Sequence, residues 1–251
     1  MSGHSKWSTI KRKKGALDAK RGKIFTRIIK EINIAIKEGG SPDPDANPRL
    51  RLAIANAKGV NMPKDNISRA IKKASDKDGE SYQEVFYEGY GPAGIALFVE
   101  ATTDNINRTV ANVRSIYSKG GGNLGTNGSL EFIFDRKGVF TIPMSALENK
   151  DMDEFEMELI DGGAEDVEKE EDVLTVYTSF EDFGNLQKKL EELNIEPESQ
   201  ELQRIPKSTQ AVDIEDGQKI LNLIEKFEED DDVNVVYHNM EMTDELAEAM
   251  E

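Results

Sequence analysis

The sequence predicts an α+β protein with an N-terminal three-helix domain followed by two small α/β-sandwich domains, the third inserted into the second. Two observations lead to this prediction. Apolar residues recur at helical spacing up to Ala74, whereas glycine-punctuated runs rich in Val, Ile, Phe and Tyr alternate with helical segments after Gly79. The charge also changes sign, since residues 1–77 carry 19 Lys or Arg against 7 Asp or Glu and residues 78–251 carry 13 against 42.

The first part of the chain is predicted to form three helices. Residues 18–38 show helical apolar spacing and end at a glycine pair. Asn47 is placed to cap a second helix with Pro48 in its first position, where no N–H is needed, and Gly59 ends it. Pro63 opens a third helix. Each helix has one apolar face and Lys or Arg on the other, so a small bundle is expected.

The second part of the chain is predicted to alternate strands and helices. Strands are expected at Tyr82–Tyr90, Ile95–Thr102, Ser129–Phe134, Val139–Pro143, Asp166–Glu168, Val173–Thr178, Glu198–Ile205 and Val233–His238. Helices are expected at Asn107–Lys119, Asp151–Ile160, Phe180–Leu193 and Glu215–Glu228. A hairpin turn at Gly91–Gly94 joins the first two strands, and Asp135–Gly138 is a further turn. The predicted domains are residues 1–78, residues 79–134 with 207–240, residues 135–206, and an acidic tail at 241–251.

The positive charge is densest close to the N-terminus. Each cation that neutralises a phosphate releases a counterion, which gives strong, salt-sensitive and mostly sequence-blind affinity. Trp7, the one tryptophan, is suited to stack on a splayed base. The alternatives are a solvated basic tail and a Trp7 that packs against Ile10. The candidate nucleic-acid-binding residues are Lys6, Trp7, Lys11, Arg12, Lys13, Lys14, Lys20, Arg21, Lys23 and Arg27.

No catalytic, cofactor or metal site is predicted, so the chain is not expected to be an enzyme. The absence of Cys excludes disulfides and thiolate zinc sites. His4 and His238 lie at opposite ends of the chain, so they form no metal-ligand pair and are expected in solvent. The G-x-S-x-G, H-E-x-x-H and phosphate-loop motifs do not occur. The many carboxylates carry no weight without a pocket signal.

One glycine-rich segment matches G-x-G-x-x-G, but in the wrong context. It follows a predicted helix and precedes a predicted strand, the reverse of the dinucleotide-binding order. We interpret it as a helix stop and a flexible loop whose glycines would allow close approach of a ligand or nucleic acid. Its residues are Gly120, Gly121, Gly122, Asn123 and Gly125.

The chain is predicted to be cytoplasmic and without membrane contact. Its longest strongly apolar stretch, Ile95–Val99, is too short to span a bilayer, and no signal-peptide apolar region follows the basic start. Gly15 and the dominance of Lys disfavour a mitochondrial transit peptide.

Five separated stretches, in order over essentially the whole chain, resemble the signatures of the YebC/PmpR family. They are Ser2–Trp7, Asp18–Phe25, Asn61–Ile67, Tyr87–Pro92 and Gly121–Gly125. The resemblance implies a three-domain, non-enzymatic protein, described for this family as a DNA-binding transcription factor. It equally implies a translational role, since family members include a mitochondrial translational activator and bacterial factors proposed to relieve ribosomes stalled on proline runs. Residues 8–14 depart from the expected Ala-Asn-Ile-Lys-like start.

These observations predict a nucleic-acid-binding regulator, with DNA as the first candidate partner. The basic helical domain would lie on the phosphate backbone, and the acidic remainder would be kept away from it by repulsion. No helix-turn-helix recognition helix with base-reading residues stands out. The alternative is a ribosome-associated factor that binds ribosomal RNA, which needs no such helix. A protein partner of the acidic domains is a third possibility.

Overall fold

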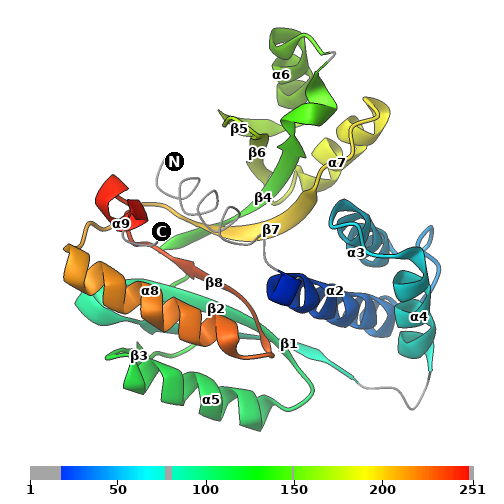
Figure 1. The fold of residues 1–251 in the computed structure, drawn as a ribbon. Coiled ribbons are helices and arrows are strands. Elements are labelled where there is room, and N and C mark those ends of the chain that lie inside the picture. Colours follow the sequence, from blue (N-terminus) through cyan, green and yellow to red (C-terminus); the bar gives the residue numbers. More distant parts are fainter. Residues whose placement is uncertain (1–17, 77–80, 149, 249–251) are drawn as a thin grey trace. The chain divides into compact units, whose positions relative to one another are not determined.

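The computed structural model describes residues 18–76, 81–148 and 150–248, and within it the side chains from Gly22 onward. The chain divides into two compact units. The first unit consists of residues 1–30, 78–135 and 205–251, and the second unit of residues 31–77 and 136–204. The predicted fold class is confirmed, since N-terminal helices precede two four-stranded sheets and the strands of one sheet lie in sequence between the strands of the other (Figure 1).

The N-terminal helices form where the apolar spacing and the caps predict them. They are α2 (Asp18–Gly39), α3 (Pro48–Gly59) and α4 (Lys64–Ser75). The side chain of Asn47 caps α3 by accepting the Leu50 N–H at 3.1 Å. Helix α2 belongs to the first unit up to Lys30 and to the second unit from Glu31.

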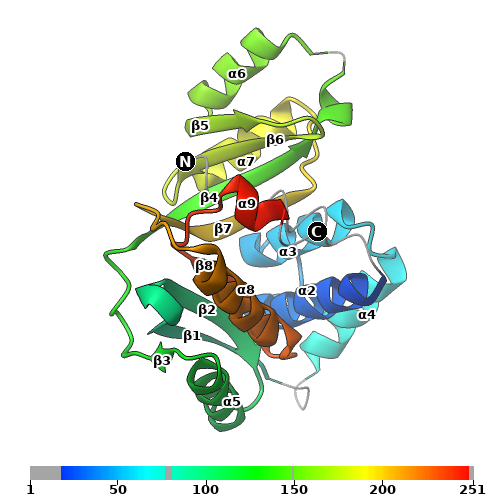
Figure 2. The ribbon, with the colours of Figure 1, turned by 60° about the vertical axis from the view of Figure 1, so that its left-hand side comes forward.

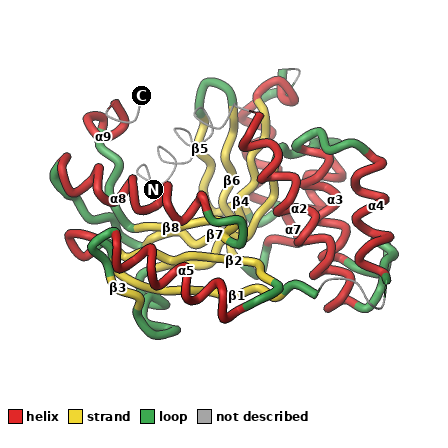
Figure 3. The backbone as a smooth tube through the Cα atoms, turned by 60° about the horizontal axis from the view of Figure 1, so that its bottom comes forward, coloured by secondary structure: helices red, strands yellow, loops and turns green. Residues whose placement is uncertain are grey.

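The sheet of the first unit has the strand order β3-β1-β2-β8. Its strands are β1 (Gln83–Tyr90), β2 (Ala96–Thr103), β3 (Asn123–Leu124) and β8 (Val233–His238). Helices α5 (Ile106–Lys119) and α8 (Ile214–Glu229) cover one face (Figure 3). Between them and the sheet lies the core, in which the Tyr117 and Phe227 rings meet edge to face at 4.8 Å and the Tyr117 hydroxyl donates to the Leu97 carbonyl.

Two residues of the predicted acidic tail at 241–251 belong to this core. Met242 is buried, and α9 (Asp244–Glu248) places Leu246 against Gly217 of α8. The acidic composition of the segment concealed these two apolar side chains. The prediction of a tail is wrong for the described residues up to Glu248.

The sheet of the second unit has the strand order β5-β6-β4-β7 (Figure 2). Along the chain, helices lie between β4 and β5 and between β6 and β7. Its strands are β4 (Phe134–Pro143), β5 (Ala164–Lys169), β6 (Val173–Ser179) and β7 (Ser199–Pro206). Its helices are the short η2 (Met144–Leu147), α6 (Met152–Asp161) and α7 (Phe183–Glu192). The core joins Phe140 and Leu174 of the sheet to Leu159 and Leu186 of the helices.

Two predicted features between β3 and β4 are wrong. Residues 129–133 form turns instead of a strand, and the predicted turn at 135–138 is the first part of β4, with Gly138 paired to Thr178. The reason is the buried Glu88 on β1, whose two carboxylate oxygens accept the N–H groups of Gly128 at 2.7 Å and Leu130 at 2.6 Å. That long-range contact holds the backbone in turns that local composition does not indicate.

Helix α3 packs against β7, the edge strand of the second sheet. The Asn56 side chain is buried and makes two hydrogen bonds to the backbone of Gln200: it donates to the carbonyl at 3.0 Å and accepts the N–H at 3.0 Å. Gly59 lies so close to the strand that a Cβ atom there would overlap the Glu198 carbonyl oxygen. Asn56 therefore takes the place of a neighbouring strand, which covers an otherwise open sheet edge.

Candidate nucleic-acid interface

The predicted basic cluster is only partly within the described residues. Lys6, Trp7, Lys11, Arg12, Lys13 and Lys14 lie outside them. Lys20 and Arg21 are residues of α2, and for these two residues the structure describes only the backbone. The described side chains of the cluster are therefore Lys23 and Arg27, both half-buried on the first part of α2.

Lys23 is occupied by contacts within the first unit. Its ammonium donates to the carbonyl oxygens of Glu228 and Asp230, the latter at 2.7 Å. These carbonyls lie at the C-terminal end of α8, where helix carbonyls lack intrahelical partners and the helix dipole is negative. Burial lowers the pKa of Lys23, and the nearby Asp231, Glu228 and Asp230 carboxylates oppose that shift. Lys23 thus anchors α2 to the end of α8.

Arg27 lines a cavity of about 310 Å³ between α2 and β8. Lys23, Thr26, Asp231 and Asn234 contribute to the same lining. Gly22 also lines the cavity, and no atom lies within 4 Å of the position that a Cβ atom would take there. The lining mixes cations with a carboxylate, so it is polar without being a purely basic pocket.

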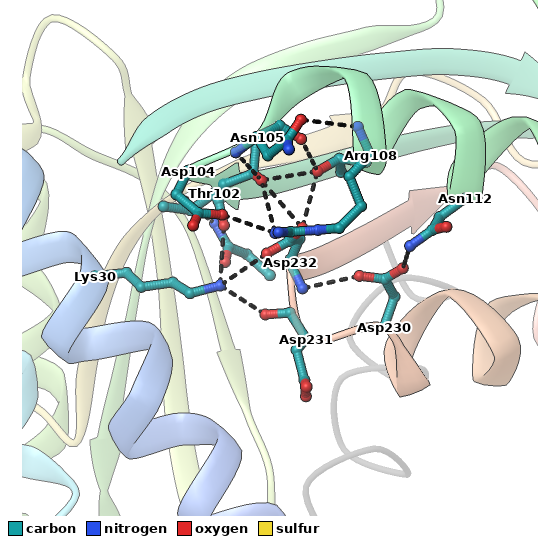
Figure 4. Close-up of polar contacts among 12 residues, drawn as sticks. Lys30, Thr102, Asp104, Asn105, Arg108, Asn112, Asp230, Asp231 and Asp232 are labelled. Atoms are coloured by element: carbon teal, nitrogen blue, oxygen red, sulfur yellow. Dashed lines mark hydrogen bonds and ion pairs between the residues drawn. The ribbon is translucent and has the colours of Figure 1, made fainter. Parts of the chain in front are cut away.

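A buried ion pair fixes the next turn of α2. The Lys30 ammonium donates to the Thr102 carbonyl at 2.9 Å and the Asp231 carbonyl at 2.7 Å, and it lies 3.4 Å from a carboxylate oxygen of Asp232 (Figure 4). Lys30 is 7% exposed and Asp232 is 6% exposed. The cation and the carboxylate therefore compensate each other in a place that water hardly reaches.

The second carboxylate oxygen of Asp232 is fully used as well. It accepts hydrogen bonds from Arg108 at 2.7 Å, Thr109 at 2.8 Å and Thr103 at 3.0 Å (Figure 4). Burial raises the pKa of Asp232, but these three hydrogen bonds and the Lys30 charge outweigh it, so the pKa is lowered overall. Sequence reasoning missed this pair because Lys30 looks like one more helix cation and Asp232 like one more residue of an acidic run.

The second unit carries an additional set of cations that was not among the predicted site residues. Helices α3 and α4 follow one another closely, and α3 contains no acidic residue (Figure 1). The apolar face of α4 is buried, which leaves its Lys and Arg in solvent. The signal was present in the sequence as Lys or Arg opposite each apolar face. The exposed cations of the two helices are Arg51, Lys58, Lys64, Arg69, Lys72 and Lys73.

Two side chains on α4 have the chemistry of base readers. The Arg69 guanidinium donates to the Asn66 side-chain oxygen at 2.5 Å and to the Asp65 carbonyl at 3.1 Å. Arg pairs with guanine edges and Asn with adenine edges in the major groove. Here the two side chains hold each other on the helix surface.

The glycine-rich segment stops α5 as predicted, but it is not an open loop. The N–H groups of Gly120 and Gly122 return to carbonyls of the last turn of α5, and Gly121 has a φ of +76°. Asn123 and Leu124 then pair with β1 as β3, and the Gly125 N–H donates to the Glu88 carbonyl at 2.7 Å. The missing side chains permit close packing, since a Cβ atom on Gly122 would lie 2.5 Å from the Tyr90 carbonyl oxygen. A ligand-binding role for this segment stays a prediction.

Other predicted features can be placed more briefly. His238 is buried in β8 and is 5% exposed, so the expectation of a solvated histidine is wrong for it. Across the part of the chain that the structure describes, no group of His, Cys, Asp or Glu is arranged to hold a metal ion. Among the same residues, no helix combines the length and apolarity needed to cross a membrane.

Comparisons with known proteins cover nearly the whole chain. Residues 5–77 match the family model described as the TACO1/YebC protein N-terminal domain, and residues 82–240 match the one described as the TACO1/YebC second and third domain. A probable transcriptional regulatory protein of Amoebophilus asiaticus is 52% identical, covering 96% of this chain and 98% of that protein. A protein of the same name from Brachyspira hyodysenteriae is 48% identical over 99% of this chain and 100% of that protein.

A solved structure agrees with these matches. The crystal structure of a conserved hypothetical protein from Aquifex aeolicus superimposes with a TM-score of 0.80 at 43% sequence identity, covering 90% of this chain and 93% of that chain. The likeness therefore extends over fold and sequence together. The chain belongs to the TACO1/YebC family.

Proposed function

We propose that this protein is a nucleic-acid-binding regulator that uses its basic N-terminal part, and that duplex DNA in transcriptional regulation is its first partner. The observation that carries the proposal is the separation of charge between residues 1–77 and the strongly acidic remainder. A field of one sign over one part of a molecule attracts a polymer of the opposite sign. The names of the bacterial relatives, probable transcriptional regulatory proteins, support the same role.

The contacts we propose fall into two kinds. Exposed cations of α3 and α4, together with the basic residues before α2, would neutralise phosphates and set the affinity. Asn66 and Arg69 would supply whatever base preference exists, after exchanging their mutual hydrogen bond for contacts to base edges. Lys23 and Lys30 contribute little to this surface because carbonyl oxygens and Asp232 already occupy their ammonium groups.

The second candidate is a ribosome-associated translation factor that binds ribosomal RNA. It is favoured by the density of Lys around Trp7, because RNA recognition relies on phosphates, shape and stacking on aromatic side chains. Sedimentation of the untagged protein from a lysate, with and without nuclease, separates the two candidates. Co-migration with ribosomal subunits favours translation, and recovery on chromosomal DNA favours transcription.

Affinity as a function of salt tests the proposed interface directly. In the full chain, Lys58→Gln, Lys64→Gln and Lys72→Gln together remove three exposed cations. We expect the slope of log affinity against log salt to become shallower by about 0.9 per lost contact on duplex DNA, or about 0.7 on single strands. Affinity for specific and random sequences should fall alike.

A matched control changes the same charge elsewhere. Arg114→Gln, Lys119→Gln and Lys188→Gln also remove three exposed cations, but from α5 and α7. The control should retain the parent slope. Equal slopes in the two triple variants would show that α3 and α4 do not contact the phosphates, and lack of affinity for both DNA and RNA at low salt would refute the proposed function.

A further inference from the structure

Helix α6 of the second unit presents apolar side chains to solvent. Met157 is 61% exposed and Ile160 is 62% exposed, although Phe155 and Leu159 of the same helix are buried in the core. Residues three apart on a helix are surface neighbours, so the two exposed side chains form one apolar pair. Single exposed apolar residues are ordinary on protein surfaces, whereas an adjacent pair on a helix that already has its core face calls for an explanation.

Carboxylates surround this pair. Asp153 and Glu154 lie four and three residues before Met157, and Asp161 lies four residues after it, so all three share its face of α6. All three are exposed, and α6 contains no Lys or Arg. The helix therefore presents an apolar centre with an acidic rim.

Helix stability accounts for only part of this arrangement. Acidic residues in the first turn favour the helix dipole, which explains Asp153 and Glu154. Asp161 is the last residue of the helix, where the dipole disfavours a negative charge, and Met157 and Ile160 add nothing to the buried core. Burial in the core therefore does not account for Met157 and Ile160, and Asp161 is opposed by the helix dipole although its carboxylate attracts the nearby Lys189 ammonium.

The same two chemistries recur in a hollow at the start of α6. Its volume is about 600 Å³, and Met144, Leu147 and Met152 provide its apolar surface. Carboxylates also line it, from Glu148, Glu171 and Asp172. Lys150, the cation of the lining, donates to the Leu193 carbonyl at 3.3 Å.

We propose that the exposed face of α6 is a docking site for a basic protein segment in which Lys or Arg side chains flank apolar residues. Apolar side chains of the partner would cover Met157 and Ile160, while its cations would pair with Asp153, Glu154 and Asp161. Charge complementarity selects this occupant, because nucleic acid and anionic lipid would both be repelled by the carboxylates. The site is distinct from the cationic helices and would give the regulator a protein partner besides nucleic acid.

Peptide binding to the full chain tests the proposal. The probe is a short labelled peptide in which lysines flank a Leu and a Trp three residues apart, measured by fluorescence anisotropy. Two further peptides replace the lysines by glutamates or the Leu and Trp by serines. We expect affinity for the first peptide to exceed that for either of the others by about tenfold or more.

Variants of the protein locate the binding. Met157→Ser with Ile160→Ser, and separately Asp153→Asn with Glu154→Gln and Asp161→Asn, should each weaken the first peptide by about tenfold. Matched controls are Ile106→Ser with Ile214→Ser, and Glu181→Gln with Glu191→Gln and Glu192→Gln, which change exposed residues elsewhere and should retain the parent affinity. Circular dichroism confirms that each variant is folded.

Several results would overturn the proposal. Equal binding of the serine peptide would indicate simple charge attraction, and parent affinity in both α6 variants would place the peptide elsewhere. Deletion of residues 1–17 that raises peptide affinity would identify the chain's own basic segment as the occupant. A change in oligomeric state caused by Met157→Ser with Ile160→Ser, seen in analytical ultracentrifugation, would identify a second copy of the chain.

Discussion

The first part of α2 and helix α3 each pack against a sheet, but through different chemistry. In the first unit, α2 is held by two lysines, Lys23 and Lys30, which bind carbonyl oxygens and a buried carboxylate. In the second unit, α3 is held by the neutral amide of Asn56 and by the close approach that Gly59 allows. In each arrangement the buried side chain from the helix forms hydrogen bonds with backbone groups of the sheet unit.

The difference lies in what each contact demands. A buried charge requires a charged partner and further hydrogen bonds, so removing one member leaves the other uncompensated. A buried Asn amide needs both a donor and an acceptor as neighbours, and a strand residue other than proline offers both through its N–H and C=O groups. The contact of α2 is thus sensitive to pH and to any loss of charge, whereas the contact of α3 is sensitive mainly to shape.

The largest expected effect comes from breaking the charged contact. Lys30→Met should lower the free energy of unfolding of the first unit by about 3–5 kcal/mol, because Asp232 loses a buried cation and the Thr102 and Asp231 carbonyls lose their donor. Urea titration followed by hydrogen exchange of the β2 and β8 amides measures this unit separately.

A lysine on the same helix serves as the control. Lys37 is exposed and donates to the Asp76 carbonyl at 2.9 Å, so Lys37→Met should change the free energy of unfolding by no more than about 0.5 kcal/mol. Similar losses in the two variants would show that the buried ion pair is not what fixes α2.

A smaller effect is expected from disturbing the shape-dependent contact. Gly59→Ala places a methyl group against the Glu198 carbonyl and should cost about 1–3 kcal/mol in the second unit, measured by exchange of the β7 amides. Gly22→Ala is the control, for which we expect the free energy of unfolding to change in the opposite direction. It adds a methyl group to open space in a helix, so it should stabilise by about 0.5–1 kcal/mol. Stabilisation by Gly59→Ala would mean that α3 does not lie against β7 in solution.

The smallest effect is a difference in pH dependence between the two contacts. An unfolded Asp has a pKa near 4, and the folded pKa of Asp232 is lower, so its contribution to stability is present above about pH 4 and is lost as the pH falls through the folded value. Acid titration monitored by exchange of the β8 amides should show this loss. Asp232→Asn should remove that part of the pH dependence, whereas Asn56→Ala should leave it intact. An unchanged acid profile in Asp232→Asn would contradict the assignment.

Much of the fold followed from local sequence patterns. The Asn47 cap, the Gly59 helix end and the Gly91–Gly94 hairpin are each determined by residues within a few positions of one another, and the structure has all three. The strand predicted at residues 129–134 was wrong because hydrogen bonds from Gly128 and Leu130 to the Glu88 carboxylate hold this backbone in turns. Glu88 lies 40 and 42 positions before these two residues. Local composition carries no information about such a partner.

For the candidate site too, local sequence predicted some features, whereas others depend on long-range contacts. The composition of residues 1–77 revealed an excess of Lys and Arg. It did not reveal which of these side chains are exposed to solvent. Lys23 was predicted to contact phosphates, and its ammonium is bound by carbonyls of residues 228 and 230. Lys58 and Lys64 were not singled out, and both are exposed. The distinction depends on contacts between residues some 200 positions apart, as the separation of 205 for Lys23 and Glu228 illustrates.

The two contacts should also leave different traces in evolution. Position 30 and position 232 are separated by 202 residues yet hold opposite buried charges, so a lineage that loses one is expected to replace the other, and the two should covary. The Asn56 side chain forms hydrogen bonds only with the backbone N–H and C=O of residue 200. Every residue except proline has both groups. A substitution at position 200 by any residue other than proline therefore requires no matching change at position 56.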